Sequence, residues 1–418
     1  MLTPPIHIVG MRPGSLDISC RAMQVLEQAE VVVGGKRLLA ALALLSTPER
    51  PLEPRRQIPV AGPLEEVIAK VRANRHRRVV VLADGDPLFY GFGRRLVEAL
   101  GPEAVNVLPN VCTLQLAAAR LRLPWHDIET VSLHGRSDYS PLFSAITRRD
   151  KVAVFTDHEN TPAAIAQALL QKGAEGFTMT VLEDLDTSQE RIRTLEPAEV
   201  WDLEFSPLNL VLLQRLHAPD ADTMQLGLGI PDHLYMHEKG LITKQAVRAA
   251  GLSLLRVLPH HTVWDLGAGC GSVAIEASHL ASRGRVVAVE RQRRRASMIR
   301  ENVRRFGAWG VEVVRGDMPG ALEGLPTPDR VFLGGGLGTD AENAEHILDV
   351  ATSALKHGGR LVAHCILLET LLRAKTYVEA KGWYYGITQM QTSTSDRLAG
   401  DLRFQAQNPV FILWTEKV

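Results

Sequence analysis

The chain has 418 residues, a length that predicts two or three domains rather than one. Apolar residues make up 45% of it and charged residues 22%, which are the proportions of an ordinary globular protein. Its 47 basic and 47 acidic side chains cancel to a formal net charge of zero. The overall charge therefore gives no reason to expect a nucleic-acid partner or a membrane surface.

The four cysteines, Cys20, Cys112, Cys270 and Cys365, are scattered and include no C-x-x-C pair. This spacing predicts neither a metal site nor a disulfide framework. We expect reduced thiols and a cytoplasmic location. The N-terminal residues lack the basic start and apolar core of a signal peptide, and no apolar run reaches the length of a membrane span.

Residues 1–216 predict two α/β lobes in series, because short apolar runs alternate with helical spacing. In the first lobe we expect strands at 6–10, 30–35, 77–83 and 105–109 and helices at 18–29, 63–73, 93–100 and 113–121. In the second we expect strands at 151–156, 178–182 and 209–213. Thr161 and Pro162 predict a helix start between them, with Thr161 as the N-cap.

Residues 217–227 are polar and lack periodicity, so we place a linker there and a C-terminal domain at 228–418. In that domain a helix is expected at 243–258. Strands are expected at 263–266, 285–290, 311–314, 330–336 and 360–365, with a closing pair at 384–390 and 409–414.

The strand at 263–266 runs into a glycine turn with the pattern D-x-G-x-G-x-G, followed by a helix start. Small residues let a ligand approach the backbone, and the helix N-terminus supplies free N–H groups. A dinucleotide fingerprint would have its third glycine at 272, where this chain has Ser272. The pattern is instead that of S-adenosylmethionine (AdoMet) methyltransferases. The predicted cofactor contacts of the turn are Asp265, Gly267, Ala268, Gly269, Cys270 and Gly271.

Two further strand ends carry acids. Glu290 ends the strand at 285–290, where a carboxylate can accept both ribose hydroxyls of a nucleoside. Asp317 and Met318 follow the strand at 311–314, where such folds contact the adenine. A plain tight turn would explain the glycines alone. Acids at three strand ends favour a cofactor site, because ligands bind at the carboxyl ends of parallel strands.

The N-terminal half resembles the tetrapyrrole (corrin/porphyrin) methylase family at residues 9–14, 85–91, 114–124 and in the segment VSLHGR at 131–136. The resemblance implies a two-lobed methylase fold that binds its own AdoMet, with contacts at Gly10, Gly14, Gly85 and Asp86. The family's first turn usually reads G-x-G-P-G, and Arg12 stands at its second glycine. A side chain there would narrow the groove or reach an anionic substrate.

The C-terminal half looks like the precorrin-6Y C15-methyltransferase/decarboxylase family, which has a Rossmann-like fold. The matching segments are GIPD at 229–232, LITKQAVRA at 241–249, the turn at 265–271, FLGGG at 332–336 and residues 408–413. The fused arrangement resembles the bifunctional precorrin-6Y C5,15-methyltransferases (decarboxylating) of cobalamin biosynthesis.

That resemblance implies methylation of C5 by the N-terminal half. It implies methylation of C15 and loss of CO₂ from the C12 acetate by the C-terminal half, converting precorrin-6Y/6B to precorrin-8. One AdoMet would bind to each half, with Thr243 as a further contact in the second. The partner would be a small-molecule precorrin, and the family's tendency to self-associate suggests a homo-oligomer.

Methyl transfer from a sulfonium mainly requires that the two reactants be positioned, so no metal or Ser-His-Asp group is expected. The substrate's carboxylates suit arginine, and Arg136 with His134 is the candidate in the N-terminal half. Asp232 and His237 are candidates in the C-terminal half, as acid, base or anchor. An ordinary exposed loop, or local capping, would explain these four residues as well. The basic run at 291–305 is interpreted as a solvated helix face.

Other functions remain open from the residues. One is the same reaction on a cobalt-containing precorrin. A nicotinamide-dependent oxidoreductase is disfavoured by Asp265 and the glycine spacing. A nucleic-acid methyltransferase is disfavoured because glycines 334–336 stand where an Asn/Asp-Pro-Pro-aromatic motif would be expected. A non-catalytic scaffold is the fourth alternative.

Overall fold

The computed structural model describes residues 4–15, 17–47, 52, 56–174, 176–216, 226–338 and 340–418. Most of the predicted linker, residues 217–225, lies outside this part of the chain. The chain divides into two compact units. One comprises Met1–Gly135, Lys151–Gln167 and Thr178–Gln214, and the other comprises Arg136–Asp150, Ala168–Phe177 and Arg215–Val418.

The first sheet is parallel throughout, in the order β3-β2-β4-β1-β5. Its elements are β1 (Ile6–Met11), α1 (Cys20–Glu27), β2 (Val31–Gly34), α2 (Lys36–Leu45), β3 (Arg56–Pro59), α3 (Leu64–Ala73), β4 (Val79–Asp84), α4 (Gly93–Leu100), η1 (Pro102–Ala104), β5 (Val105–Leu108) and α5 (Thr113–Leu121). Parallel strands are covered on both faces, which explains their continuous apolar sequences. The strands predicted here are confirmed.

The second sheet has the order β6-β7-β10-β8-β9 and mixes parallel and antiparallel pairs. The elements of this region are β6 (Glu129–Ser132), α6 (Ser140–Arg148), β7 (Lys151–Phe155), α7 (Pro162–Lys172), β8 (Phe177–Glu183), β9 (Arg191–Leu195), α8 (Pro197–Val200) and β10 (Asn209–Arg215). The predicted cap is confirmed, because the hydroxyl of Thr161 accepts the Ala164 N–H at 3.2 Å.

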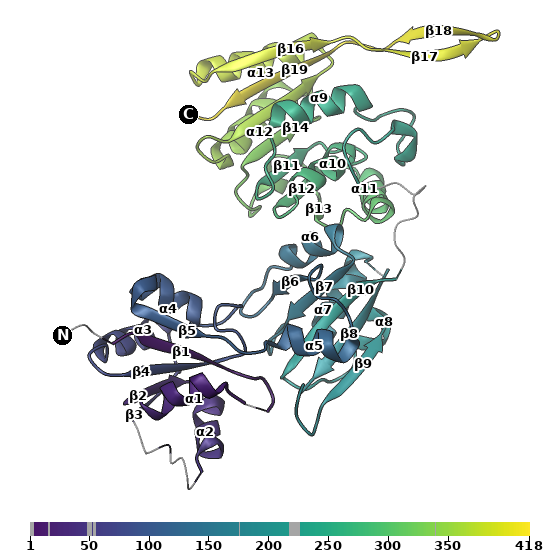
Figure 1. Ribbon diagram of the computed structural model, residues 1–418. Coiled ribbons are helices and arrows are strands. Elements are labelled where there is room, and N and C mark those ends of the chain that lie inside the picture. Colours follow the sequence, from purple (N-terminus) through teal and green to yellow (C-terminus); the bar gives the residue numbers. More distant parts are fainter. Residues whose placement is uncertain are drawn as a thin grey trace. The chain divides into compact units, whose positions relative to one another are not determined.

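The third sheet has seven strands in the order β13-β12-β11-β14-β15-β19-β16 (Figure 1). Its first half comprises η2 (Asp232–Leu234), α9 (Gln245–Leu255), β11 (Thr262–Leu266), α10 (Ser272–Leu280), β12 (Arg285–Glu290), α11 (Arg293–Phe306), β13 (Val311–Arg315) and η3 (Gly320–Leu322). The rest comprises β14 (Arg330–Leu333), α12 (Ala341–Ala354), β15 (Arg360–Cys365), α13 (Leu368–Ala380), β16 (Tyr385–Met390), β17 (Ser393–Leu398), β18 (Asp401–Ala406) and β19 (Val410–Glu416).

The strand order of this sheet fixes where a ligand can bind. β12 and then β13 lie on one side of β11, and β14 and then β15 lie on its other side. All five of these strands are parallel. The crevice beyond the carboxyl ends of β11 and β14 is therefore a topological switch point, the usual ligand site of such folds. The closing pair β16 and β19 is confirmed and is antiparallel.

A hairpin of β17 and β18 extends from this sheet beyond β16 and β19 (Figure 1). This hairpin was not predicted. β17 is polar at five of its six positions, whereas β18 does alternate polar with apolar residues, a strand signal that the prediction missed; all twelve positions are exposed. Its turn has positive φ at Ala399 and Gly400, the geometry that matches hairpin twist. Among the described residues, no helix is both long and apolar enough to cross a membrane.

Candidate functional site

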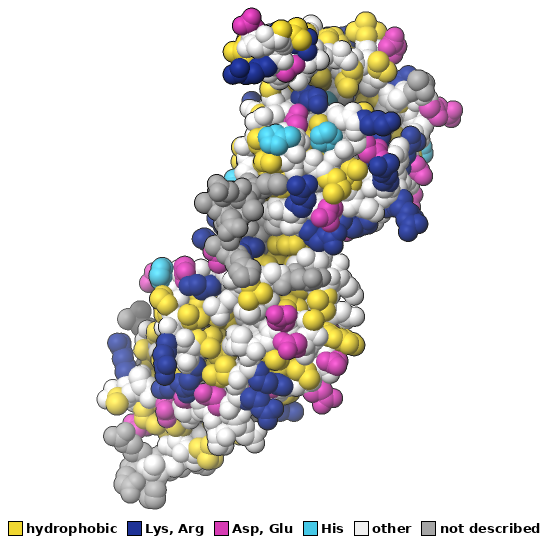
Figure 2. All heavy atoms as spheres, turned by 90° about the vertical axis from the view of Figure 1, so that its right-hand side faces the viewer, with side chains coloured by type: hydrophobic (Ala, Val, Ile, Leu, Met, Phe, Trp, Pro, Cys, Tyr) yellow, Lys and Arg dark blue, Asp and Glu magenta, His cyan; other side chains and the backbone are white. Residues whose placement is uncertain are grey.

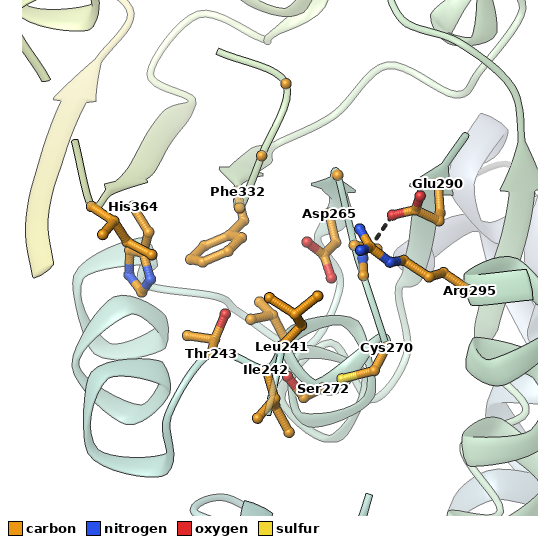
Figure 3. Close-up of a pocket in the computed structure, with 18 of the residues that line it drawn as sticks. Leu241, Ile242, Thr243, Asp265, Cys270, Ser272, Glu290, Arg295, Phe332 and His364 are labelled. Carbon is orange, nitrogen blue, oxygen red and sulfur yellow. Dashed lines mark hydrogen bonds between the residues drawn. The ribbon is translucent and has the colours of Figure 1, made fainter. Parts of the chain in front are cut away.

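A cavity of about 900 Å³ opens at the carboxyl ends of β11, β12, β14 and β15 (Figure 3). Of the predicted contacts, those that line it are Thr243, Asp265, Gly267, Ala268, Gly269, Cys270, Glu290, Asp317 and Met318. Gly271 is the N-cap of α10 at the end of the same turn. The structure therefore brings together residues predicted from four separate segments.

The glycine turn is held by hydrogen bonds to β12. The N–H groups of Gly267 and Ala268 both donate to the Val289 carbonyl at 3.0 Å. Gly267 has a φ of +72°, and a Cβ there would lie 2.8 Å from the backbone of Gly335. Only glycine fits this position, because both the conformation and the space exclude a side chain. The loops after β11 and β14 can therefore approach closely at the switch point.

Asp265 lies beneath the turn and is 1% exposed. Its Oδ2 accepts the Ala274 N–H at 2.9 Å, in the first turn of α10. Burial raises the pKa of this carboxyl to about 7, since little water reaches the charged form. Asp265 thus fixes the start of α10 and places a carboxylate at the helix N-terminus.

Glu290 ends β12 and is 4% exposed. One carboxylate oxygen accepts the Gly269 N–H at 3.0 Å and the other accepts the Gln292 N–H at 2.9 Å. These bonds orient the carboxylate beside the glycine turn, and Figure 3 shows it at the cavity edge next to Arg295. Arg295 is itself paired with Glu238 at 3.2 Å.

Asp232 and His237 are not among the described residues that line the cavity. Asp232 accepts a hydrogen bond from Arg248 at 3.1 Å, and Nδ1 of His237 accepts the Gly240 N–H at 3.3 Å. Arg248 is fully buried and also donates to Glu276 at 2.7 Å. These contacts order the segment that leads into α9.

In the N-terminal half, three strand ends meet. The Gly85 N–H donates to the Met11 carbonyl at 2.6 Å, and the Gly85 carbonyl accepts the Asn110 N–H at 3.2 Å. A Cβ on Gly10 would lie 2.0 Å from the Gly85 carbonyl oxygen. Loops after β1, β4 and β5 are therefore in contact at the predicted position. The carboxylate of Asp86 accepts a hydrogen bond from the N–H of Leu88, two residues further on, at 2.9 Å.

Arg12 is engaged by an acid from the second lobe of the same unit. Its guanidinium forms an ion pair with Asp186 at 2.6 Å. Asp186 also pairs with Arg120 at 3.1 Å, and Arg120 pairs with Glu190 at 2.6 Å. Gly14 lies against this segment, since a Cβ there would be 2.1 Å from the Leu185 carbonyl oxygen. The unusual arginine thus joins the turn after β1 to the loop after β8.

His134 and Arg136 lie in the exposed loop that follows β6. Between them, Gly135 has a φ of +67°, and its N–H donates to Asp157 at 2.6 Å. That contact shapes the loop, and it leaves the two predicted substrate residues on the surface.

Comparison with known proteins matches each half of the chain to a protein family. Residues 5–199 match the family model described as tetrapyrrole (corrin/porphyrin) methylases, and residues 233–417 match the precorrin methyltransferase domain. A precorrin-6Y C(5,15)-methyltransferase (decarboxylating) from Sinorhizobium sp is 33% identical over 367 residues, which cover 88% of this chain and 86% of the relative. This chain belongs to that family.

Two other matches concern the C-terminal half. A probable cobalt-precorrin-6B C(15)-methyltransferase (decarboxylating) from Saccharolobus solfataricus is 32% identical, over 45% of this chain and 96% of its own. A crystal structure of precorrin-6y C5,15-methyltransferase from Geobacter metallireducens GS-15 is 38% identical, over 46% of this chain and 98% of that one, with a TM-score of 0.43. The predicted family and fold class are confirmed.

Several polar side chains that line the cavity were not predicted, among them Lys244, Arg295, Asn343, Asn408 and His364 of β15. The ring of His364 lies 4.6 Å from that of Phe332, edge to face. Neither ring nitrogen has a hydrogen-bond partner among the described residues. Burial lowers the pKa of His364 to about 4. The available signal was a single polar residue near the end of the apolar strand RLVAHC.

The basic run at 291–305 forms α11, whose buried face is apolar apart from Asn302. The arginines at 293, 294, 300, 304 and 305 are exposed. Figure 2 shows Lys and Arg side chains on this side of the molecule interspersed with acidic ones. The interpretation of this run as a solvated helix face is confirmed.

Proposed function

We propose that this protein is a bifunctional AdoMet-dependent C-methyltransferase of corrin biosynthesis. The N-terminal half would methylate C5 of a precorrin, and the C-terminal half would methylate C15 with loss of CO₂ from the C12 acetate, giving precorrin-8. The observation that carries the proposal is the cavity at the β11–β14 switch point, whose glycine turn is tied to an acid at the end of β12.

The side chains around this cavity fit AdoMet. The held carboxylate of Glu290 suits two ribose hydroxyls, and Asp317 with Met318 would border the adenine. A Cβ on Gly269 would meet nothing within 4 Å, so the turn leaves room for a ligand against its backbone. When bound, AdoMet supplies an electrophilic methyl group. The protein would hold the acceptor carbon in line with it and exclude water.

The start of α10 argues against a dinucleotide. A pyrophosphate would use the free N–H groups of that helix N-terminus. Here the Ala274 N–H already donates to the Asp265 side chain, so this group is not free to bind a phosphate. A nucleoside carrying a positive sulfonium suits such a site better.

A second AdoMet would bind in the N-terminal half, at the meeting of the loops that contain Gly10, Gly14, Gly85 and Asp86. His134 and Arg136 would contact the substrate's carboxylates there, since both are exposed. In the C-terminal half, the hydrogen bonds of Asp232 and His237 favour the structural alternative for these two residues.

The partner would be a precorrin, and nucleic acid would not be bound. Relatives named for precorrin and for cobalt-precorrin both match, so the metal content of the substrate remains open. We expect a homo-oligomer, which the exposed apolar side chains of the β17–β18 hairpin support. We also expect the protein to work in the cytoplasm, as its cysteine spacing suggests.

The test is to incubate the full-length protein with AdoMet and metal-free precorrin-6B, then to analyse the product by mass spectrometry. Two added methyl groups and the loss of one CO₂ per macrocycle are expected. A product that gains methyl groups but keeps every carboxylate would contradict the C15 half of the proposal.

A further inference from the structure

His364 stands at the end of the cavity opposite the predicted nucleoside contacts. Figure 3 shows it beside Phe332 and Thr243 on one side, with Glu290 and Arg295 on the other. Phe332 and His364 are the lining residues that β14 and β15 themselves supply. Their position beyond the switch point is where an acceptor would meet a cofactor held by β11 and β12.

Apolar residues line part of the cavity that contains His364 and Thr243. The cavity lining here includes Leu241, Ile366 and Val410, and the side chains of Leu241 and Ile366 are 59% and 63% exposed. A conjugated macrocycle has flat apolar faces, so it would be well accommodated by this surface. His364 is then one of the polar groups that such an acceptor would meet, and the one that β15 supplies.

The imidazole is held closely but is not hydrogen bonded. A Cβ on Gly251 would lie 2.3 Å from Nε2 of His364, so the ring rests directly on the backbone of α9. Phe332 packs against it from β14. Buried polar groups nearly always have partners, so the two unpartnered nitrogens of His364 need an explanation, and a catalytic role is one that such groups can have. Both ring nitrogens are shielded from solvent as the ring lies, so the ring must rotate before a nitrogen meets an acceptor.

The reaction proposed above, on which this inference rests, has a simple proton balance. The C15–CH₃ bond forms with a ring electron pair, and the methyl–sulfur bond breaks with its pair left on sulfur. The C15–H bond must then break, returning its pair to the ring. When the C–CO₂ bond breaks, its pair stays on the exocyclic carbon, delocalised into the conjugated ring, until that carbon gains a proton. One proton leaves and one is taken up.

We propose that His364 is a catalytic residue that accepts the proton lost from C15 and delivers it to the exocyclic carbon that loses CO₂. A single imidazole is sufficient for both proton transfers, because it accepts one proton and gives it back. His364 is therefore neutral again at the end of each turnover. Burial keeps the imidazole neutral and able to accept a proton near neutral pH. The same burial disfavours the imidazolium, which promotes return of the proton to the substrate.

The first test is His364→Phe in the full-length protein, which keeps a ring against Phe332 and removes both nitrogens. The rate of C15 methylation should fall about 100-fold or more, the usual effect of losing a general acid–base group. AdoMet binding by calorimetry and the rate of C5 methylation should stay within about threefold. His357→Phe, at an exposed histidine of the same unit, is the matched control and should change nothing.

The second test follows the proton in the wild-type protein. A precursor with deuterium at C15 is converted in a single turnover, and the new C12 methyl group is analysed by mass spectrometry. Deuterium in that methyl group supports a carrier shielded from solvent. Its complete absence, or C15 methylation by His364→Phe within about threefold of wild type, overturns the inference. A wild-type protein that transfers no methyl group to C15 contradicts the proposed function instead.

Discussion

The two proposed cofactor sites both form where parallel strands end, yet they are assembled differently. In the C-terminal site, the turn after β11 and the acid at the end of β12 are neighbours in the sheet, joined by backbone hydrogen bonds. In the N-terminal site, the turn after β1 is joined to the loop after β8 by an ion pair between Arg12 and Asp186. Both sites have backbone hydrogen bonds between the ends of adjacent strands, but only the second adds an ion pair between residues 174 positions apart.

This difference predicts how each site would respond to amino-acid substitutions. Backbone hydrogen bonds and close glycine contacts cannot be replaced by a neighbouring side chain, so the C-terminal turn should fail abruptly. Partly exposed ion pairs contribute little singly and share partners, so the N-terminal contact should weaken gradually. Four substitutions sharpen the comparison.

The largest effect is expected from Glu276→Leu, which removes the support of the C-terminal site. Glu276 is fully buried and accepts hydrogen bonds from Arg248, Gly229 and Ile230. The substitution leaves the buried Arg248 guanidinium with Asp232 as its remaining acidic partner, at 3.1 Å. Breaking a buried ion pair from one side typically costs about 3–5 kcal/mol, and the pair with Asp232 should keep the loss at the lower end of that range. Urea unfolding of the full-length protein should show a transition shifted to lower denaturant, with a second transition unchanged.

The control is the double variant Arg248→Met/Glu276→Leu, which removes the Arg248 charge as well. It should recover much of the lost stability, because replacing both partners of a buried pair costs far less than replacing one. Equal destabilisation by the single and double variants would show that the pair's geometry, not its charge, supports this segment.

Gly269→Val should be nearly as damaging to activity, but only for one of the two reactions. Gly269 has a φ of +60°, which a β-branched residue adopts at a cost of about 1–3 kcal/mol, and the valine would fill the space beside the turn. We expect loss of C15 methylation, with C5 methylation largely intact, in the mass spectrum of the product.

Gly324→Val is a matched control for this substitution. Gly324 has a φ of +72° and open space around a Cβ, but it is not among the described residues that line the cavity. Its variant carries similar backbone strain and should retain C15 methylation. If Gly269→Val removed both methylations together, the model of two separate cofactor sites would be wrong.

The sequence predicted most of the buried strands and the C-terminal turn because both depend on local patterns. It did not predict β3, β6 or β9, each of which buries at most one residue. Buried parallel strands need continuous apolar runs, and the turn needs glycine at fixed spacing. The β17–β18 hairpin was not predicted, since it buries none of its residues and only β18 alternates polar with apolar residues.

Contacts between residues that are far apart in the sequence could not be predicted, for a different reason. Arg248 and Glu276 are 28 residues apart, and nothing local in either segment indicates that they pair. His364 looked like a single polar residue in an apolar strand, and only the fold places it in the cavity. For Asp265, the motif located the residue, and the structure showed a hydrogen bond to the start of α10.

Glu290→Gln should weaken cofactor binding at one site of the two. The glutamine keeps an acceptor for the Gly269 N–H but loses the charge and one acceptor for a ribose hydroxyl. Hydrogen bonds to charged groups contribute about 1.5–3 kcal/mol, so affinity should fall roughly 10- to 100-fold. Calorimetry with AdoMet should then resolve one weakened site and one unchanged site.

The exposed Glu323→Gln is the control for that measurement and should leave both affinities unchanged. Weakening of both sites by Glu290→Gln would mean that the two halves are coupled. No weakening of either would remove Glu290 from the cofactor site.

The smallest effect is expected from Arg12→Gly, which restores the pattern G-x-G-P-G. The Arg12 side chain is about one-third exposed and is paired with Asp186, so it is held at the second lobe rather than free to reach a substrate. Ion pairs of this kind contribute about 1 kcal/mol or less, and Asp186 would keep its pair with Arg120. The KM for AdoMet in C5 methylation should therefore change by no more than about fivefold, with C15 methylation unaffected. A larger loss confined to the KM for the precorrin would show instead that Arg12 leaves Asp186 to bind a substrate carboxylate, and Arg12→Lys should then restore part of the affinity because the charge is retained.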